Sequence, residues 1–407
     1  MYNILMLTPY LPYPPISGGR TRTYNLIKRL RRDCTITLVC FGRPEERAFD
    51  LTPLRELCET YVIERAPSPS TLQAAILSLT SIQPITMRLY RTEQMQEKLA
   101  HLLEDRRYDV VHVESFYMLQ NLPQPCPIPI LLAEPAIEYV AWWRHARVAQ
   151  PIYQRPAIAL EALKMRVYEP RDWRRSQMVG AMSQIDAGIV RRVTPEVPTM
   201  LAPNGVDEDY FQPADVQRAP SVAIFMGDYK YFPNSDAVLY FASEIMPLIR
   251  ARKPEFTLHL LGKEPPAEIR ALGDDPASGI KVLGLVDDTR PHLTSATMFI
   301  CPLRSGSGTR FKLLEALACG LPVVSTTLGA EGLGAVDGEQ MLIADTPEAF
   351  AQAVLRLLDD SALAGRLSSQ GRTWVVEQHS WSRSAALLVE AYQQLSTDRH
   401  VGAVAQV

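Results

Sequence analysis

Residues 298–325 read MFICPLRSGSGTRFKLLEALACGLPVVS, and this stretch decides the fold class. The apolar run Met298–Leu303 is typical of a buried strand, and a loop of small residues follows it. The apolar-periodic segment that begins at Phe311 predicts a helix ending at Gly320. Pro322–Ser325 then predicts a second buried strand. A strand, a loop, a helix and a strand in this order imply two parallel strands joined by a crossover.

The loop before this helix suits an anion. Its small residues let backbone N–H groups approach a ligand closely, and a helix N-terminus favours negative charge. Arg310 and Lys312 add two positive charges, so the expected ligand is a diphosphate. Glu315 lies one helical turn beyond Phe311, at a position suited to bind a pair of sugar hydroxyls. An ordinary glycine-rich turn with solvated side chains is the alternative. The residues of this predicted site are Ser305, Gly306, Ser307, Gly308, Thr309, Arg310, Lys312 and Glu315.

Length and composition narrow the class of protein. A chain of 407 residues is long for one core, so two domains are expected. An apolar fraction of 47% with 21% charged residues is ordinary for a soluble protein, and the net charge of −3 gives no nucleic-acid signature. The six cysteines form no CxxC pair, which favours a reducing compartment. No apolar run reaches membrane-spanning length, so we expect a cytoplasmic protein.

Strand-like and helix-like segments alternate along both halves of the chain. This predicts an α/β fold with two doubly wound parallel sheets. Pro203–Asp207 breaks the pattern between them, and the polar segment Phe211–Ser221 is the predicted linker. Helices are expected from Pro347 to about Thr397, with a break near His379. The predicted strands are Asn3–Thr8, Thr35–Phe41, Tyr61–Arg65, Val110–Glu114, Ile128–Glu134 and Gln177–Ser183, then Val222–Gly227, Phe256–Gly262, Ile280–Val286, Met298–Leu303, Pro322–Ser325 and Met341–Ala344.

Three motifs carry a family resemblance: Gly18–Gly19 in the first loop, Pro203–Asp207 at the hinge, and Gly306–Val324. Phe232–Asn234, ahead of a helix, and Gly284–Asp288 also match the family pattern. With them the chain resembles, over nearly its whole length, the retaining GT-B glycosyltransferases of the group-4 family (glycosyl transferases group 1). The resemblance implies two Rossmann-like domains facing a central cleft. Residues 1–202 would be the acceptor side, with helix 381–397 packing back on it, and residues 203–380 would bind the nucleotide sugar.

The resemblance also implies roles for individual residues. Arg310 and Lys312 would neutralise the diphosphate, Glu315 would bind the ribose, and Val286 would meet the base through its backbone. Gly18 and Gly19 would help to bind the donor. The implied reaction transfers a sugar from a nucleoside diphosphate to a glycan or lipid-linked acceptor with retention of configuration, in cell-surface polysaccharide or glycoconjugate synthesis. It needs no metal and no other cofactor, and no protein nucleophile.

The chain departs from the family pattern in the first domain. Related sequences often place a histidine where this chain has Pro135. His112 could substitute for it on the acceptor side, or be a structural residue of its strand. Glu138 could contact the reacting sugars, or be a helix N-terminal glutamate favoured by the dipole. Lys230 could serve the donor or be solvated. A protein that binds a nucleotide sugar or glycan without turnover is therefore the alternative function.

Two further stretches have open interpretations. Trp142–Arg147 and Arg155–Arg175 mix aromatic and basic residues, which suits peripheral contact with the cytoplasmic face of a membrane. The alternative is a solvated basic face whose tryptophans pack inside. The apolar, proline-rich loop Tyr10–Ile16 is either an acceptor contact or a stiff surface loop.

Overall fold

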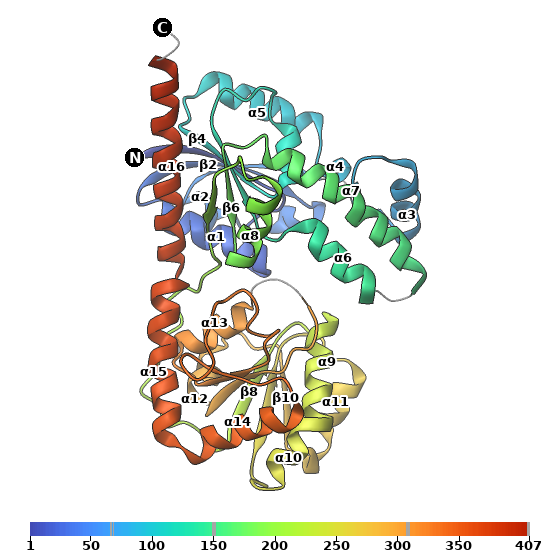
Figure 1. The fold of residues 1–407 in the computed structure, drawn as a ribbon, viewed down its shortest axis with the longest axis vertical. Helices are drawn as coiled ribbons and strands as arrows, with labels where there is room; N and C mark the ends of the chain where they lie inside the picture. Colours follow the sequence, from blue (N-terminus) through green and yellow to red (C-terminus); the bar gives the residue numbers. More distant parts are fainter. Residues whose placement is uncertain (66, 68, 149–151, 307–309, 405–407) are drawn as a thin grey trace. The chain divides into compact units, whose positions relative to one another are not determined.

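The computed structural model describes residues 1–404 except 66, 68, 149–151 and 307–309. The chain forms two compact units (Figure 1). Unit 1 comprises Met1–Pro203 together with Ser384–Val407, and unit 2 comprises Asn204–Arg383. The chain therefore crosses between the units twice, at residues 203–204 and 383–384.

Unit 1 is built on a seven-stranded parallel sheet with the order β3-β2-β1-β4-β5-β6-β7. Its central strands are buried along their whole length, which is why β4 (VVHVE) and β5 (ILLAE) are nearly continuous apolar runs. The strand order reverses between β1 and β4. The strands are β1 (Tyr2–Thr8), β2 (Cys34–Gly42), β3 (Glu59–Glu64), β4 (Val110–Glu114), β5 (Ile130–Glu134), β6 (Met178–Ala181) and β7 (Thr199–Leu201).

Helices cover this sheet, and α6 and α7 form a long pair that extends away from it together with α3 (Figure 1). The last helix, α16, returns to unit 1 from residue 384 onward. The helices are α1 (Gly18–Leu30), α2 (Thr52–Arg55), α3 (Thr71–Thr80), α4 (Ile85–Leu89), α5 (Glu93–Asp105), α6 (Glu138–Val148), α7 (Arg155–Trp173), α8 (Gln184–Val193) and α16 (Trp381–Val404).

Unit 2 contains a six-stranded parallel sheet with the order β10-β9-β8-β11-β12-β13, which reverses between β8 and β11. Its strands are β8 (Val222–Met226), β9 (Thr257–Leu261), β10 (Ile280–Gly284), β11 (Met298–Cys301), β12 (Val323–Ser325) and β13 (Leu342–Ile343). Its helices are α9 (Phe232–Tyr240), α10 (Met246–Arg250), α11 (Ala267–Asp274), α12 (Arg290–Ser295), α13 (Phe311–Ala318), α14 (Pro347–Asp359) and α15 (Ser361–Gln378).

The predicted pattern of two doubly wound parallel sheets is confirmed. The predicted helix break near His379 is confirmed as well, since α15 ends at Gln378 and α16 begins at Trp381. Several strand and helix boundaries were wrong, most of them by one or two residues. The strand predicted to reach Val286 ends at Gly284, whose positive φ of 72° turns the chain. Helix α16 continues to Val404, beyond the predicted end at Thr397.

Several elements of unit 1 were not predicted, among them α2, α4, β7 and α7. Strand β7 has only three half-buried residues, too few to show a period. Helix α7 buries Glu161, Glu169 and Asp172 on its inner side. Polar residues on the inner face hide the apolar stripe by which a helix is recognised in a sequence.

Candidate functional site

The loops that follow β8 and β11 meet where the strand order of unit 2 reverses. Open α/β sheets bind ligands at this point, outside the carboxyl ends of the strands. Residues 227–231 lead from β8 to α9, and residues 302–310 lead from β11 to α13. Residues 298–325 therefore supply one half of this site, and residues 227–231, in the loop after β8, supply the other half.

Lys312 joins the two halves. Its Nζ donates a hydrogen bond to Oδ1 of Asn234 on α9 at 2.7 Å, and it lies 4.2 Å from the centre of the Phe225 ring. Burial, and then the charge of Arg310, lowers the pKa of Lys312 to about 8. Asn234 is held in turn, because its Nδ2 donates to the Asp228 carbonyl at 2.8 Å. An anion at this position would relieve the cost of keeping the lysine charged.

Gly227, at the carboxyl end of β8, makes this approach possible. A Cβ there would lie 2.6 Å from Nδ2 of Asn234 and 3.0 Å from Nζ of Lys312. A larger residue would displace both groups. Sequence reasoning assigned no role to Gly227 or Asn234; the signals were a glycine directly after a buried strand and the Phe232-Pro233-Asn234 triplet at the next helix start.

Arg310 stands at the N-cap position of α13 and is buried, with 7% of its surface exposed. Gly306 has a φ of 109°, and a Cβ there would lie 3.0 Å from Oη of Tyr231 and 3.3 Å from Nη2 of Arg310. The hydroxyl of Ser305 is buried, and no described residue accepts or donates a hydrogen bond to it. Ser307, Gly308 and Thr309 lie outside the described residues.

Glu315 lies in the second half of α13 and is half-buried. Burial raises its pKa to about 7, and Lys312 opposes this rise. Val286 lies two residues beyond the end of β10 and packs partly against the core of unit 2. Lys230 forms an ion pair with Glu264 on the exposed surface, so the structure gives it a surface partner.

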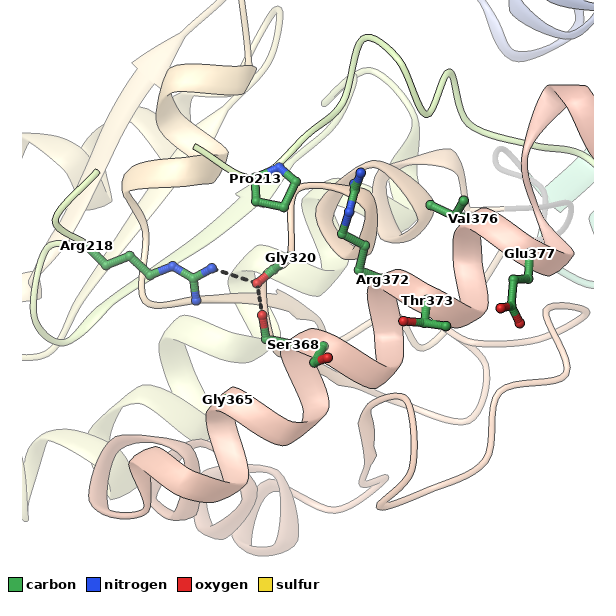
Figure 2. Close-up of a pocket in the computed structure, with 10 residues that line it drawn as sticks. Pro213, Arg218, Gly320, Gly365, Ser368, Arg372, Thr373, Val376 and Glu377 are labelled. Atoms are coloured by element: carbon green, nitrogen blue, oxygen red, sulfur yellow. Dashed lines mark hydrogen bonds between the residues drawn. The ribbon is translucent and has the colours of Figure 1, made fainter. Parts of the chain in front are cut away.

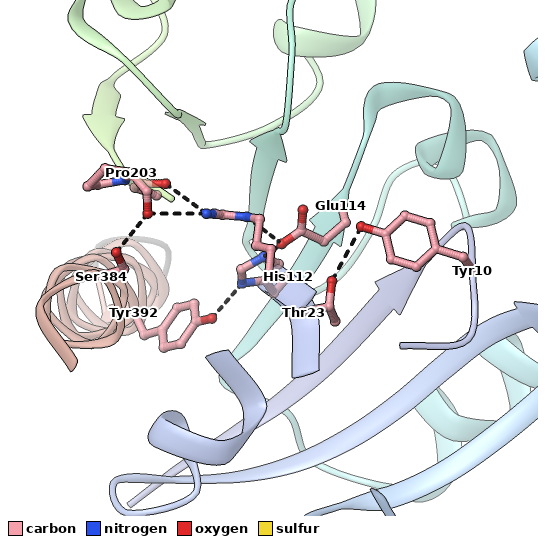
Figure 3. Close-up of polar contacts among 9 residues, drawn as sticks. Tyr10, Thr23, His112, Glu114, Pro203, Ser384 and Tyr392 are labelled. Carbon is pink, nitrogen blue, oxygen red and sulfur yellow. Dashed lines mark hydrogen bonds and ion pairs between the residues drawn. The ribbon is translucent and has the colours of Figure 1, made fainter. Parts of the chain in front are cut away.

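The corresponding reversal point in unit 1 lies between β1 and β4 (Figure 3). Gly18 and Gly19 open α1 there, as the sequence predicts. A Cβ on Gly19 would lie 2.6 Å from the hydroxyl of Tyr10. The packing of Tyr10, whose hydroxyl lies 3.4 Å from that of Thr23, therefore requires a glycine at this position. The loop residue Tyr10 points inward rather than to the surface.

His112 and Glu114 are fully buried on β4. His112 uses both ring nitrogens: Nε2 lies 3.3 Å from Oε1 of Glu114, and Nδ1 lies 2.5 Å from the hydroxyl of Tyr392 on α16 (Figure 3). Because a carboxylate only accepts, Nε2 donates and Nδ1 accepts from Tyr392. This placement favours the structural interpretation of His112.

Arg22 of α1 completes this cluster. Its Nε lies 3.6 Å from Oε1 of Glu114, and its Nη1 donates to the carbonyl oxygens of Ala202 and Pro203 at 3.0 and 3.3 Å. Burial raises the pKa of Glu114, but Arg22 and His112 outweigh it, so the pKa stays below its usual value. The buried Arg22 thus has a carboxylate partner within the fold of unit 1.

Glu138 opens α6 close to a second buried acidic group. Its Oε2 accepts from Nε1 of Trp142 at 3.1 Å, and burial raises its pKa. Glu169 of α7 accepts from the backbone N–H groups of Glu138 and Tyr139, which caps α6. Burial and the nearby Glu169 raise the pKa of Glu134, at the end of β5, well above its usual value. Pro135 follows directly.

Two features are absent from the described part of the chain. No group of three His, Cys, Asp or Glu side chains there is arranged to hold a metal ion. None of the described helices has the length and apolar character needed to cross a membrane.

Known proteins resemble this chain in sequence over part of its length. The family model described as glycosyl transferases group 1 matches residues 220–360. The phosphatidyl-myo-inositol mannosyltransferase of Mycolicibacterium smegmatis is 29% identical over 203 residues, which is 48% of this chain and 51% of that protein. The lipopolysaccharide core biosynthesis glycosyltransferase LpsE of Rhizobium meliloti is 35% identical over 118 residues, covering 28% and 33% of the two chains. The chain spans about half the length of the first of these curated relatives.

Solved structures resemble it over nearly the whole chain. Sucrose-phosphate synthase from Thermosynechococcus elongatus aligns with a TM-score of 0.69 at 19% identity, covering 98% of this chain and 100% of that one. HepE from Anabaena, solved with UDP and glucose, aligns with a TM-score of 0.66 at 14% identity, covering 97% and 100%. At such identities the likeness concerns the fold. This chain therefore has the GT-B fold, and residues 220–360 of its unit 2 match the family model of the glycosyl transferases group 1.

Proposed function

We propose that this chain is a glycosyltransferase that binds a nucleoside diphosphate sugar in unit 2 and transfers the sugar, with retention of configuration, to a glycan or lipid-linked acceptor. One observation carries the proposal: the partly buried Lys312 stands beside Arg310 at the start of α13, at the reversal point of the sheet. The named relatives act on a lipid inositol and in lipopolysaccharide core synthesis, which favours a glycoconjugate acceptor.

The chemistry follows from charge. Breaking the bond between a sugar and a diphosphate leaves negative charge on the departing phosphate. Preorganised cations and a helix N-terminus stabilise that charge in the transition state. Lys312, Arg310 and the first turn of α13 would supply them. The leaving phosphate would accept the proton of the acceptor, so the reaction would need neither a protein nucleophile nor a metal. Glu315 would bind the ribose, and Glu138 would contact the acceptor or the transferred sugar.

A thermal-shift panel of UDP-, GDP-, ADP- and TDP-sugars with EDTA present tests donor binding. A ligand that binds only the folded chain raises the melting temperature. One clear hit would support the proposal and identify the base; no shift at millimolar ligand would contradict it.

The anomeric configuration of the transfer product, measured by proton NMR, tests retention. Donor binding without hydrolysis or transfer would favour the alternative function, a protein that binds a nucleotide sugar or glycan without turnover. The presence of Pro135 where related sequences often have a histidine is the observation that supports this alternative.

The proposal includes peripheral contact with the cytoplasmic face of a membrane through α6 and α7. Trp143, Ile152, Tyr153, Leu163 and Val167 are exposed large apolar residues of this region. The four carboxylates of the two helices are buried or half-buried, whereas Arg144, Arg147, Arg166 and Arg171 are exposed. An apolar surface with exposed positive charge suits anionic lipid.

Co-sedimentation with vesicles of phosphatidylcholine and phosphatidylglycerol tests this contact. Binding is expected to need the anionic lipid and to fall in a Leu163→Ser, Val167→Ser double variant. Leu239→Ser and Leu248→Ser, at exposed positions of unit 2, provide the matched control. Equal sedimentation of the wild type and the double variant would contradict membrane contact through these helices.

A further inference from the structure

A cavity of about 440 Å³ lies in unit 2 at the far end of α13 (Figure 2). It is open to solvent on one side and is lined by the linker after Phe211, the turn at Gly320 and one side of α15. Its volume is within the range of small-molecule sites, about 300–1,000 Å³. It is separate from the candidate donor site, because the eight residues of α13, about 12 Å of helix, lie between Arg310 and Cys319.

Two arginines from different elements line this cavity. Nη2 of Arg218, in the linker, donates to the Gly320 carbonyl at 2.6 Å. Nη1 of Arg372, on α15, donates to the carbonyl oxygens of Ala318 and Phe211. Each guanidinium uses one terminal nitrogen in this way and has further N–H groups, since arginine carries five donors. Both side chains are half-buried.

The two guanidinium groups donate to backbone carbonyls rather than to carboxylates. Within the described residues, neither Arg218 nor Arg372 forms an ion pair with a carboxylate, and the only acidic residue of the lining is the exposed Glu377. Burial lowers the pKa of Arg218, which reflects the cost of keeping this cation away from water. An anion between the two guanidinium groups would offset that cost, and arginine matches the oxygens of a phosphate group closely.

The other residues that line the cavity indicate what the ligand carries besides its anionic group. Ser369 and Thr373 offer hydroxyl groups on α15, while Pro213 and Val376 offer apolar surface (Figure 2). Such a mixture suits a small hydroxylated carbon skeleton. We propose that this cavity is a second binding site in unit 2, for a small phosphorylated metabolite whose phosphate is held by Arg218 and Arg372. This inference does not depend on the proposed transferase activity.

The test uses the full chain with Lys312→Met, so that the candidate donor site does not contribute to phosphate binding. Titration calorimetry with inorganic phosphate and with glucose 6-phosphate is expected to detect one site. Arg372→Gln should weaken binding by about tenfold or more, because a charge-assisted contact is lost. Arg366→Gln is the matched control: Arg366 is an exposed arginine of α15 outside the cavity, and the same charge is removed.

A second variant separates binding from folding, because Arg372 also caps the last turn of α13. Thr373→Trp fills the cavity from its exposed rim and leaves both arginines in place. It should abolish binding while the melting temperature and near-ultraviolet circular dichroism stay unchanged. The proposal is overturned if neither phosphate compound binds at millimolar concentration, or if Thr373→Trp and Arg372→Gln both bind like the control.

Discussion

Both units have a point at which the strand order of the sheet reverses, but Arg22 beside that point in unit 1 has a charged partner, whereas Lys312 beside it in unit 2 has a neutral partner. Each parallel sheet reverses its strand order once, at β1 and β4 in unit 1 and at β8 and β11 in unit 2. In unit 1 the buried cation Arg22 is paired with the buried carboxylate of Glu114. In unit 2 the hydrogen-bond acceptor of Lys312 is the neutral amide of Asn234. A cation paired within the fold stabilises the fold, whereas a desolvated cation beside a neutral amide is suited to a ligand.

The largest expected effect is on the stability of unit 1. Arg22→Met leaves Glu114 buried without its cation and should lower the free energy of unfolding by about 3–5 kcal/mol. Urea denaturation followed by circular dichroism measures this. Arg32→Met, at an exposed arginine just beyond α1, should change it by less than about 0.5 kcal/mol. Equal midpoints for the two variants would show that the ion pair of unit 1 is not structural.

The second effect is on ligand binding in unit 2. Lys312→Met should weaken nucleotide-sugar binding by about 10- to 150-fold, as expected for a charged contact to phosphate worth about 1.5–3 kcal/mol. The melting temperature without ligand should stay the same or rise, because a partly desolvated charge is removed. The control is Lys253→Met, which removes the same charge at an ion pair with Asp359 outside the two site loops. If Lys312→Met lost stability but kept its affinity for the nucleotide sugar, Lys312 would be a structural residue like Arg22, and the proposed difference between the two units would be wrong.

A subtler change tests the geometry around Lys312. Gly227→Ala places a methyl group where Nδ2 of Asn234 and Nζ of Lys312 lie, at 2.6 and 3.0 Å. We expect donor affinity to fall by about tenfold, because the lysine is displaced without losing its charge. Gly188→Ala on α8, where a Cβ meets nothing within 4 Å, is the control. Calorimetric titration of the best donor compares the two, and unchanged affinity in Gly227→Ala would mean that Lys312 is not a donor contact.

The smallest effect is on pH dependence. Lys312 in empty unit 2 has a pKa of about 8, because burial disfavours its charge. A diphosphate binds the charged form, so donor affinity should be level below pH 8 and fall above it, by at most about tenfold per pH unit. In Lys312→Arg the charge persists over this range, and the fall between pH 8 and 9.5 should disappear. A wild-type affinity that stays level to pH 9.5 would contradict this assignment.

Much of this arrangement can be predicted from the sequence, because its causes are local. Buried parallel strands are short continuous apolar runs, and small residues before an apolar-periodic segment mark a loop that enters a helix. The alternation of such segments predicted both sheets, and residues 298–325 placed Arg310 and Lys312 at a helix start. Glu315 was found in the same way, one turn further along.

Only the tertiary structure decided which side chains meet. Lys312 contacts Asn234 across 78 residues of sequence, and His112 contacts Tyr392 across 280. Strand order sets these contacts, and local patterns do not contain it. The same limit explains Gly19, whose sequence position suggests a ligand loop but whose missing Cβ makes room for Tyr10. The sequence by itself determined where charged and small residues enter the elements. The fold decided that Arg22 is paired with a carboxylate within unit 1, while the hydrogen-bond acceptor of Lys312 is the amide of Asn234.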